Sequence, residues 1–327
     1  MVPAAAIVWS LVVSAKLIES PCIPESVVQL CALMNAFGRE LRSQPDCWRR
    51  TATVASAVAD MLPKDGQRVC VLGCGTSLYM GQAYAAFRES ANGGETDAFP
   101  ASEAPRSRRY DLVVALSRSG TTTEVLDAVT DIRQRIGSPV LAITSSLGSP
   151  LAEVANTHIV LDFADEVAIV QTRFATSALL LLLSGCGWDI QASASDAEVV
   201  LGEGPPNIPD ADQYVFVGRG IAAPIASEAA LKLRESAKAW SEAYPSMEFR
   251  HGPISAVGTR TVVWSIDPIE PSLSYQIEAT GASVISGRAD SIAELVRVHL
   301  VAEQLAKAAG FDPDTPDHLT RSVILTP

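Results

Sequence analysis

The sequence predicts an α/β protein built from two tandem, doubly wound lobes, each with a mostly parallel sheet flanked by helices. The first indication is that short apolar strands alternate with helix-forming segments along the chain. The second is an internal repeat. RVCVLGCGTSLYMGQAYAAFRES and YVFVGRGIAAPIASEAALKLRES both run from a strand through a Gly-x-Gly turn into a helix, with Gly73 and Gly218 at matching positions. The third is the Pro-, Gly- and Asp-rich stretch 202–213, which is typical of a linker. We therefore expect a first lobe over residues 34–200 and a second over residues 201–327.

The first lobe begins with a predicted helix. Residues 34–62 have apolar positions at helical spacing, and Pro63-Lys64-Asp65-Gly66 ends the pattern. RVCVLGCGTS then gives a strand and turn, followed by the helix LYMGQAYAAFRES. The same unit returns in YDLVVALSRSGTTTEVLDAVTDIRQRIG, and PVLAITSS and THIVLDF give two further strands. The apolar helix TRFATSALLLLLSGCG closes this half, and roughly a dozen apolar residues are too few for a membrane span.

The second lobe continues with the strands RTVVWSI and ASVISG and ends with the helix SIAELVRVHLVAEQLAKAAG. Residues 1–33 form an N-terminal extension of doubtful status, because their apolar run of roughly a dozen residues is too short for a span. No Lys or Arg precedes that run, which makes it a weak signal peptide. We favour Met34 as the native start, or an innocuous extension, over secretion.

Composition excludes several classes of protein. Of the 327 residues 48% are hydrophobic, so the chain can bury large cores, and its net charge of -12 without a basic run disfavours nucleic-acid binding. The six cysteines and four histidines have no metal-ligand spacing, which predicts reduced thiols in a cytoplasmic protein and no metal site. GCGTS lacks the third glycine of a dinucleotide fingerprint and no Walker lysine is present, so we expect no cofactor.

Two turns rich in Gly, Ser and Thr follow consecutive strands, where helix N-termini expose unpaired N–H groups in a parallel sheet. Such residues also make ordinary helix caps and turns, which is the alternative for either motif alone. Two turns in succession favour a site for a phosphate monoester, with Arg118 able to add a charge-assisted contact. The candidate binding residues are Gly75, Thr76, Ser77, Ser117, Arg118, Ser119, Thr121 and Thr122.

A cluster of acids and a lysine carries the predicted chemistry. Glu228, Lys232 and Glu235 stand at i, i+4 and i+7, hence on one helical face, which we expect near the carboxyl end of the strand that precedes Gly218. A surface Glu–Lys pair is the alternative, but a partly buried carboxylate beside a lysine can be tuned into a proton-transfer base. Glu248 and His251 are expected in a separate turn beside this face, although a lone histidine is more often structural.

The motifs GCGTS, SRSGTT, EAALKLRES and EFRHGP, in this order, resemble the sugar isomerase (SIS) domain family over about residues 34–327. The chain is most similar to the isomerase half of glutamine–fructose-6-phosphate transaminase. It also resembles the stand-alone amino-sugar-phosphate deaminases and the tagatose-6-phosphate ketose/aldose isomerase group. The resemblance implies paired SIS lobes in a homodimer whose sugar-phosphate sites are shared between subunits.

The resemblance also implies roles for individual residues. Ser117, Ser119 and Thr122 would bind the phosphate, and Thr76 and Ser77 would line the site. Glu235 would move a proton between C1 and C2 of the sugar. His251, reaching in from the neighbouring subunit, would assist ring opening. Glu228 and Lys232 would support them.

Two departures narrow the expected activity. Arg321 stands where the synthase pattern has a lysine, and arginine cannot form a Schiff base, although it could bind an oxygen or a phosphate. The absence of a glutamine-hydrolysing domain disfavours glutamine-dependent synthesis, and Gln171 in VQTRFAT is more similar to the stand-alone enzymes.

The sequence therefore predicts an enzyme acting on a hexose 6-phosphate. The leading hypothesis is conversion of glucosamine 6-phosphate to fructose 6-phosphate and ammonia. Deglycation of a fructosamine 6-phosphate and plain ketose/aldose isomerisation are alternatives that use the same proton transfer. A non-catalytic sugar-phosphate-binding regulator is the rival from another class.

Overall fold

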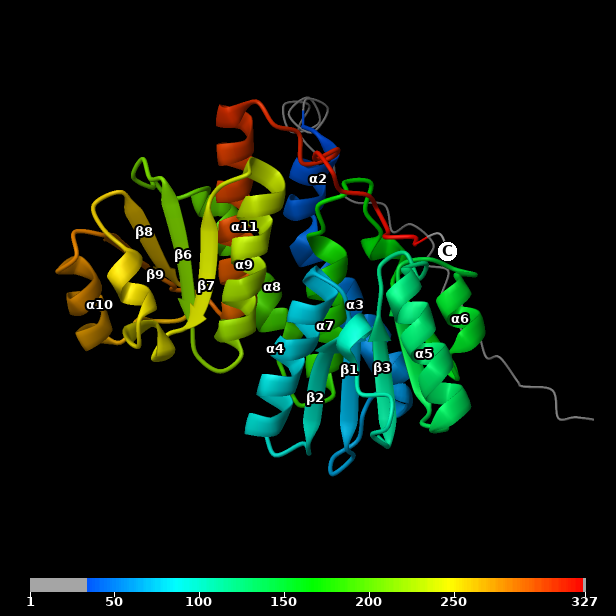
Figure 1. Cartoon of the computed structure of the whole chain (residues 1–327). Coiled ribbons are helices and arrows are strands. Elements are labelled where there is room, and N and C mark those ends of the chain that lie inside the picture. The colour runs from blue at the N-terminus through cyan, green and yellow to red at the C-terminus, as the bar shows by residue number, and fades with distance from the viewer. Residues whose placement is uncertain (1–33, 326–327) are drawn as a thin grey trace, which may run out of the picture.

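The structure, a computed structural model, describes residues 34–325, and Figure 1 shows two sheets with a layer of helices between them. The predicted N-terminal extension, residues 1–33, lies outside the described residues. Both sheets are entirely parallel, as predicted. None of the helices in residues 34–325 combines the length and the apolar character that crossing a membrane requires.

The first sheet has the strand order β2-β1-β3-β4-β5. Strands β1, β3 and β4 are apolar and almost wholly buried, because helices cover both of their faces. The strands are β1 (Val69–Gly73), β2 (Thr96–Pro100), β3 (Leu112–Leu116), β4 (Val140–Thr144) and β5 (Thr157–Val160). The helices of this lobe are α4 (Thr76–Ser90), α5 (Thr123–Arg135), α6 (Pro150–Val154) and α7 (Arg173–Ser184), with short 3₁₀ turns η2 (Ala101–Glu103) and η3 (Asp162–Ala164).

The second sheet has the order β7-β6-β8-β9, which repeats the arrangement of the first four strands of the first sheet. Its strands are β6 (Gln213–Gly218), β7 (Ser241–Pro245), β8 (Thr261–Ser265) and β9 (Ser283–Ser286). Helices α9 (Ala222–Ala237) and α10 (Pro271–Glu278) and the turns η4 (Glu248–Arg250) and η5 (Pro253–Ala256) belong to this lobe. The repeat deduced from the sequence is therefore present in the structure.

Gly73 and Gly218 hold equivalent places in the two sheets, and glycine is required at both for the same steric reason. Each ends the first strand of its sheet, where the following helix crosses close to the backbone. A Cβ atom on Gly73 would lie 2.7 Å from the carbonyl carbon of Ser77, and one on Gly218 would lie 2.3 Å from the carbonyl oxygen of Ala222. Only glycine allows this approach of helix to strand.

Helices from both ends and from the middle of the chain lie in the layer between the sheets. These are α2 (Ala36–Arg42), α3 (Gln44–Val58) with the turn η1 (Ala59–Met61), α8 (Ile190–Glu203) and α11 (Ser291–Ala309). Helix α11 packs on α9 and α8, α3 packs on α7 and α8, and α4 packs on α9. One hydrophobic core cluster consequently extends from Val71 of the first sheet to Phe216 of the second. The division of the chain at residues 200 and 201 remains a prediction.

Three details differ from the sequence-based expectation. The single helix predicted for residues 34–62 is broken at Ser43, and α3 restarts with Pro45 in its first turn, where a missing N–H costs no hydrogen bond. The edge strands β2 and β7 were not expected, because TDAFP and SEAYP are short, partly polar and end in proline. Helix α8 was not expected and runs to Glu203, inside the predicted linker 202–213, while residues 204–212 are irregular, as a linker requires.

Candidate active site

A buried lysine joins the two lobes at the predicted acid cluster. Lys232 Nζ donates to Glu235 Oε2 at 2.5 Å and to Thr76 Oγ1 at 3.0 Å, and lies 3.3 Å from Glu228 Oε1. The side chains of Lys232 and Glu228 are 0% and 1% exposed, whereas that of Glu235 is 20% exposed. The three α9 residues therefore share one face, and only Glu235 has a carboxyl that solvent can reach.

The charges of the cluster follow from this burial. Burial raises the pKa of Glu228 to about 7, although the attraction of Lys232 opposes the change. Burial alone would lower the pKa of Lys232, but the two carboxylates outweigh it and the pKa is raised. Lys232 consequently stays charged, and Glu228 titrates near neutral pH.

The cluster lies at the carboxyl edge of the first sheet. Thr76 begins α4 directly after Gly75, whose φ of +54° makes the turn that follows β1. Lys232 and Glu235 come late in α9, and a helix rise of 1.5 Å per residue places Glu235 about 20 Å from the beginning of that helix at Ala222. The expectation that this face adjoins the carboxyl end of the strand before Gly218 is therefore wrong for Glu235.

The second predicted turn presents four hydroxyl groups at the N-terminus of α5. Ser117 Oγ accepts from the N–H of Gly120 at 3.2 Å and lies 3.5 Å from Thr122 Oγ1. Thr121 Oγ1 donates to Ser119 Oγ at 2.9 Å. The φ of +65° at Gly120 and its contact with Ser149 leave no room for a side chain there. This turn, the hydroxyl turn (residues 117–122), offers the neutral donors that suit a phosphate.

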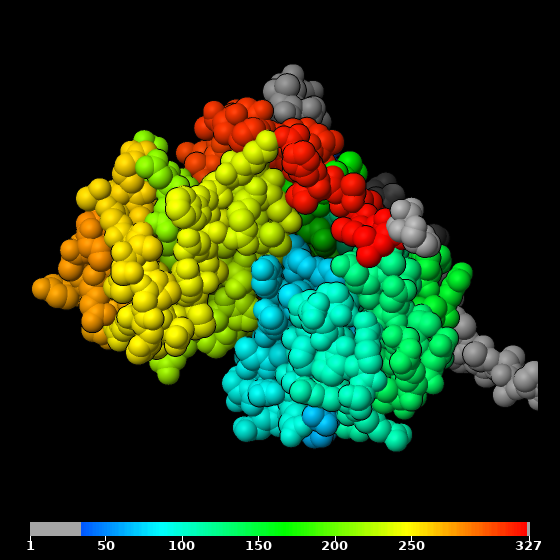
Figure 2. All heavy atoms as spheres, in the orientation of Figure 1, coloured from blue at the N-terminus to red at the C-terminus, as the bar shows by residue number. Residues whose placement is uncertain are grey.

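The C-terminal segment after α11 covers both parts of the candidate site. Asp317 pairs with Lys238, at the end of α9, at 2.5 Å. Further on, Ser322 Oγ lies 2.9 Å from Thr121 Oγ1, and the carbonyl of Val323 accepts from the N–H of Thr123 at 3.2 Å. Figure 2 shows this segment, in red, lying across the top of the two lobes.

A cavity of about 540 Å³ lies between the end of α9 and this C-terminal segment, and Glu235 lines it together with Phe311 and Thr315. Glu235 is therefore one of the residues that face this cavity. A second cavity, of about 600 Å³, lies between α3 and the loop before α8, and its lining includes none of the predicted site residues.

Three further predicted binding residues, Arg118 of the hydroxyl turn, Gln171 and Arg321, have different surroundings. The buried guanidinium of Arg118 donates to the carbonyls of Ala168, at 2.8 Å, and Arg321, at 3.1 Å. Arg321 in turn pairs with Asp165. The Oε1 atom of Gln171 is buried and has no hydrogen-bond partner among the described residues. Protein carbonyls thus accept the hydrogen bonds of Arg118, and the substrate contacts predicted for these three residues stay predictions.

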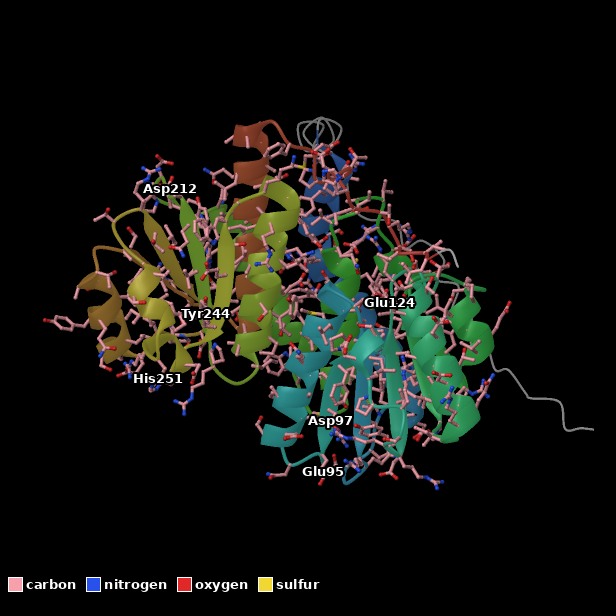
Figure 3. The ribbon with its side chains drawn as sticks, in the orientation of Figure 1. Glu95, Asp97, Glu124, Asp212, Tyr244 and His251 are labelled. Atoms are coloured by element: carbon pink, nitrogen blue, oxygen red, sulfur yellow. The ribbon has the colours of Figure 1, made fainter. Side chains whose placement is uncertain are left out.

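His251 lies far from the cluster within the same chain. It is exposed, between η4 and η5, and Figure 3 places it at the outer edge of the second lobe, while Glu124 marks the hydroxyl-turn end of α5. The turn containing Glu248 and His251 exists, but the expectation that it lies beside the acid cluster is wrong within one chain. The prediction that His251 enters a neighbouring subunit's site is left untested.

Sequence reasoning missed two residues that contact the predicted site residues. Ser322 bonds to the hydroxyl turn, and Asp165 holds Arg321 while accepting from Ser145 Oγ at 2.6 Å. No local pattern signals either contact, because both depend on where the C-terminal segment lies. Among residues 34–325 no group of three His, Cys, Asp or Glu side chains is arranged to hold a metal ion.

Comparison with known proteins shows what the chain is similar to. Residues 62–184, which contain β1 to α7, match the SIS domain. Glutamine–fructose-6-phosphate aminotransferase (isomerizing) from Methanothermobacter thermautotrophicus is 28% identical over 88% of this chain and 52% of its own length. The enzyme of that name from Sulfurisphaera tokodaii is 26% identical over 87% of this chain and 56% of its own length. The chain thus spans about half the length of these curated relatives.

Two solved structures share the fold. Glucosamine-6-phosphate deaminase from Thermotoga maritima superposes with a TM-score of 0.75 at 24% identity, covering 89% of this chain and 100% of that chain. Tagatose-6-phosphate ketose/aldose isomerase from Escherichia coli gives a TM-score of 0.77 at 20% identity, covering 90% and 98%. Residues 62–184, in the first of two lobes with the same strand arrangement, are thus similar to the SIS domain, and the chain shares the fold of these structures.

Proposed function

We propose that this chain is a phosphosugar isomerase that acts on an amino-hexose 6-phosphate and releases ammonia. The substrate would be glucosamine 6-phosphate and the products fructose 6-phosphate and ammonia. The names of the relatives and fold neighbours support the class, since they act on glucosamine, fructose or tagatose 6-phosphates. The observation that carries the proposal is the solvent-reached carboxyl of Glu235, held by the buried Lys232 at the edge that also bears the hydroxyl turn.

The proposed reaction uses one proton-moving group. In the open-chain aldose, Glu235 removes the proton from C2, the electrons of that C–H bond form the C1=C2 bond, and the C1 carbonyl oxygen takes a proton from water, which gives an enolamine. The proton on Glu235 then returns to C1 and the nitrogen gives one proton back to water. The resulting 2-imine is hydrolysed by water to the ketone with loss of ammonia. Lys232 holds the carboxylate in place through their 2.5 Å contact. A positioned carboxylate of this kind typically contributes about 10²- to 10⁴-fold in rate.

The hydroxyl turn would bind the phosphate at the other end of the sugar. Ser117, Ser119 and Thr122 offer hydroxyls beside the N-terminus of α5, and Thr76 and Ser77 begin α4 at the same sheet edge. Arg321, paired with Asp165, would hold the C-terminal segment over the substrate instead of forming a Schiff base.

The test is to mix purified protein with glucosamine 6-phosphate and measure ammonia and fructose 6-phosphate together. Wild-type protein should release both in equal amounts, while Glu235→Gln should not. Glu278→Gln, a change in an exposed carboxylate on α10, is the matched control and should behave as wild type. Formation of fructose 6-phosphate from glucose 6-phosphate, with no ammonia released from glucosamine 6-phosphate, would indicate a plain isomerase. Tight binding of hexose phosphates without turnover would show a regulator and overturn the proposal.

The exposed His251 supports a shared site in a homodimer, in which it would open the sugar ring in the partner's site. Mixing inactive Glu235→Gln and His251→Ala proteins tests this directly. In a shared-site dimer, random exchange of subunits restores about one quarter of the wild-type sites, because half of the dimers carry one intact site of two. No recovery after demonstrated subunit exchange would place His251 outside the neighbouring site.

A further inference from the structure

A buried histidine lies on the helix that backs the acid cluster. His299 is on α11, which packs along α9, and it is only 1% exposed. Its Nδ1 atom is 3.2 Å from Gln44 Nε2, at the start of α3. The reaction proposed above does not use this histidine.

The neighbours of Gln44 determine which nitrogen of His299 carries the proton. Gln44 Nε2 also donates to the carbonyl of Leu41 at 3.0 Å, and its Oε1 accepts from Thr176 Oγ1 at 3.0 Å, so the amide has one orientation. Since Gln44 Nε2 is a donor, Nδ1 of His299 must accept. A neutral imidazole then carries its hydrogen on Nε2.

That Nε2–H group and one carboxylate oxygen of the acid cluster both lack a hydrogen-bond partner among the described residues. His299 Nε2 and Glu228 Oε2 are buried, and neither has a hydrogen-bond partner among the described residues. One is a donor and the other an acceptor, on two helices that pack against each other. Buried polar groups in folded proteins are nearly always paired, often through an internal water.

We propose that His299 is a positioning residue of the acid cluster, whose Nε2–H donates through a bound water to the Glu228 oxygen that Lys232 leaves free. The inference rests on the proposed function. A donor to a carboxylate favours its ionised form. His299 would therefore keep Glu228 ionised, so that Lys232 is shared between two carboxylates and Glu235 stays basic enough to take the substrate proton.

The surrounding charges agree with a neutral histidine. Burial and the nearby positive charge of Lys232 together lower the pKa of His299 to about 3. The charged groups of the cluster on α9 are Glu228, Lys232 and Glu235, and Thr76 of α4 contacts Lys232 through its neutral hydroxyl. On α11 itself, Glu303 pairs with Arg42 and Glu294 with Arg297.

Two substitutions distinguish the roles of the two ring nitrogens of His299. In His299→Gln the amide nitrogen can take the place of Nε2 and keep the donor toward Glu228. In His299→Asn the shorter amide keeps a partner for Gln44 but loses that donor. Because a protonated Glu228 leaves Lys232 to Glu235 alone and makes that base weaker, the acid limb of the kcat/KM profile should follow the ionisation of Glu228. We therefore expect His299→Asn to move this limb to higher pH by about one unit, and His299→Gln to leave it within about 0.3 unit.

Thr176→Val is the matched control, because it disturbs the same buried network at Gln44 without touching Nε2. It should lower stability and leave the pH profile in place. Equal profiles for all three variants would show that His299 is merely structural and would overturn the proposal.

A readout without turnover separates this inference from the proposed function. Nitrogen NMR of the wild-type protein should show His299 protonated on Nε2 alone throughout pH 5 to 8. Carboxyl-carbon NMR should show the titration of Glu228 shifted upward in His299→Asn, even if no sugar phosphate is ever turned over. A proton on Nδ1, or an unchanged Glu228 titration, would refute the role of His299.

Discussion

Removing the cation from the acid cluster should destabilise the fold strongly. In Lys232→Met the side chain keeps its length, but the ammonium group that contacts Glu228, Glu235 and Thr76 is lost. Glu235 is 20% exposed, so water can replace part of its lost contact, whereas Glu228 is 1% exposed and has no substitute. Most of the cost therefore comes from Glu228.

The expected loss is about 3–5 kcal/mol, which is typical when one partner of a buried ion pair is removed. In the double variant Glu228→Gln/Lys232→Met the stranded charge is absent, and the loss should fall to about 2 kcal/mol. The single change Glu228→Gln should cost about 1–2 kcal/mol, since Lys232 keeps Glu235. The coupling free energy between Lys232 and Glu228 is then about 2–5 kcal/mol.

Urea unfolding of the four proteins at pH 8 measures these free energies, because Glu228 is ionised there in the wild type. Repeating the series at pH 5.5 should shrink the cost of Lys232→Met, since the stranded carboxyl can then take a proton. A loss below about 1 kcal/mol at pH 8, or a double variant as unstable as the sum of the singles, would refute the reasoning.

Three further predictions concern the helix crossing, the hydroxyl turn and the pH dependence. Gly218→Ala should cost about 1–3 kcal/mol, because its Cβ would lie 2.3 Å from the Ala222 carbonyl oxygen. The control Gly202→Ala, with open space around it in α8, should be neutral or stabilising in thermal unfolding. Ser117→Ala should raise KM for the phosphorylated sugar about tenfold, as expected for one lost hydrogen bond to a charged group, and change kcat less; an unchanged KM would remove Ser117 from the phosphate site. Burial raises the pKa of Glu228 from 4.5 to about 7, so the folded protein holds more protons than the unfolded chain in that range. Its contribution to stability should then decline as pH rises through that window, and Glu228→Gln should flatten the decline in melting temperature; an unaltered slope would contradict this assignment.

The fold could be predicted because its strongest signals are local. Strands β1, β3 and β4 are continuous apolar runs, and the glycines at 73 and 218 mark the two places where a helix must cross close to a strand. The edge strands β2 and β7 give no such signal, since they are partly exposed and partly polar, and their pairing comes from the neighbouring strand.

The candidate site was predictable in its composition and less so in its arrangement. Helical spacing alone puts Glu228, Lys232 and Glu235 on one face. That spacing does not show that the face meets Thr76 across the lobe junction. The contact depends on the packing of α4 on α9, which is tertiary structure and has no local sequence signal. The same limit explains Arg118, whose acceptors lie about 50 residues or more away in the sequence.

The most direct test of the central claim is whether Glu235 moves a carbon-bound proton. Wild-type protein, Glu235→Gln and the control Glu278→Gln would be incubated with glucosamine 6-phosphate in D₂O, and deuterium at C1 and C2 followed by NMR. We expect wild type and control to incorporate solvent deuterium, and Glu235→Gln to do so at least about 100-fold more slowly while still binding the sugar. Incorporation at the wild-type rate in Glu235→Gln would contradict the assignment of this carboxylate as the base.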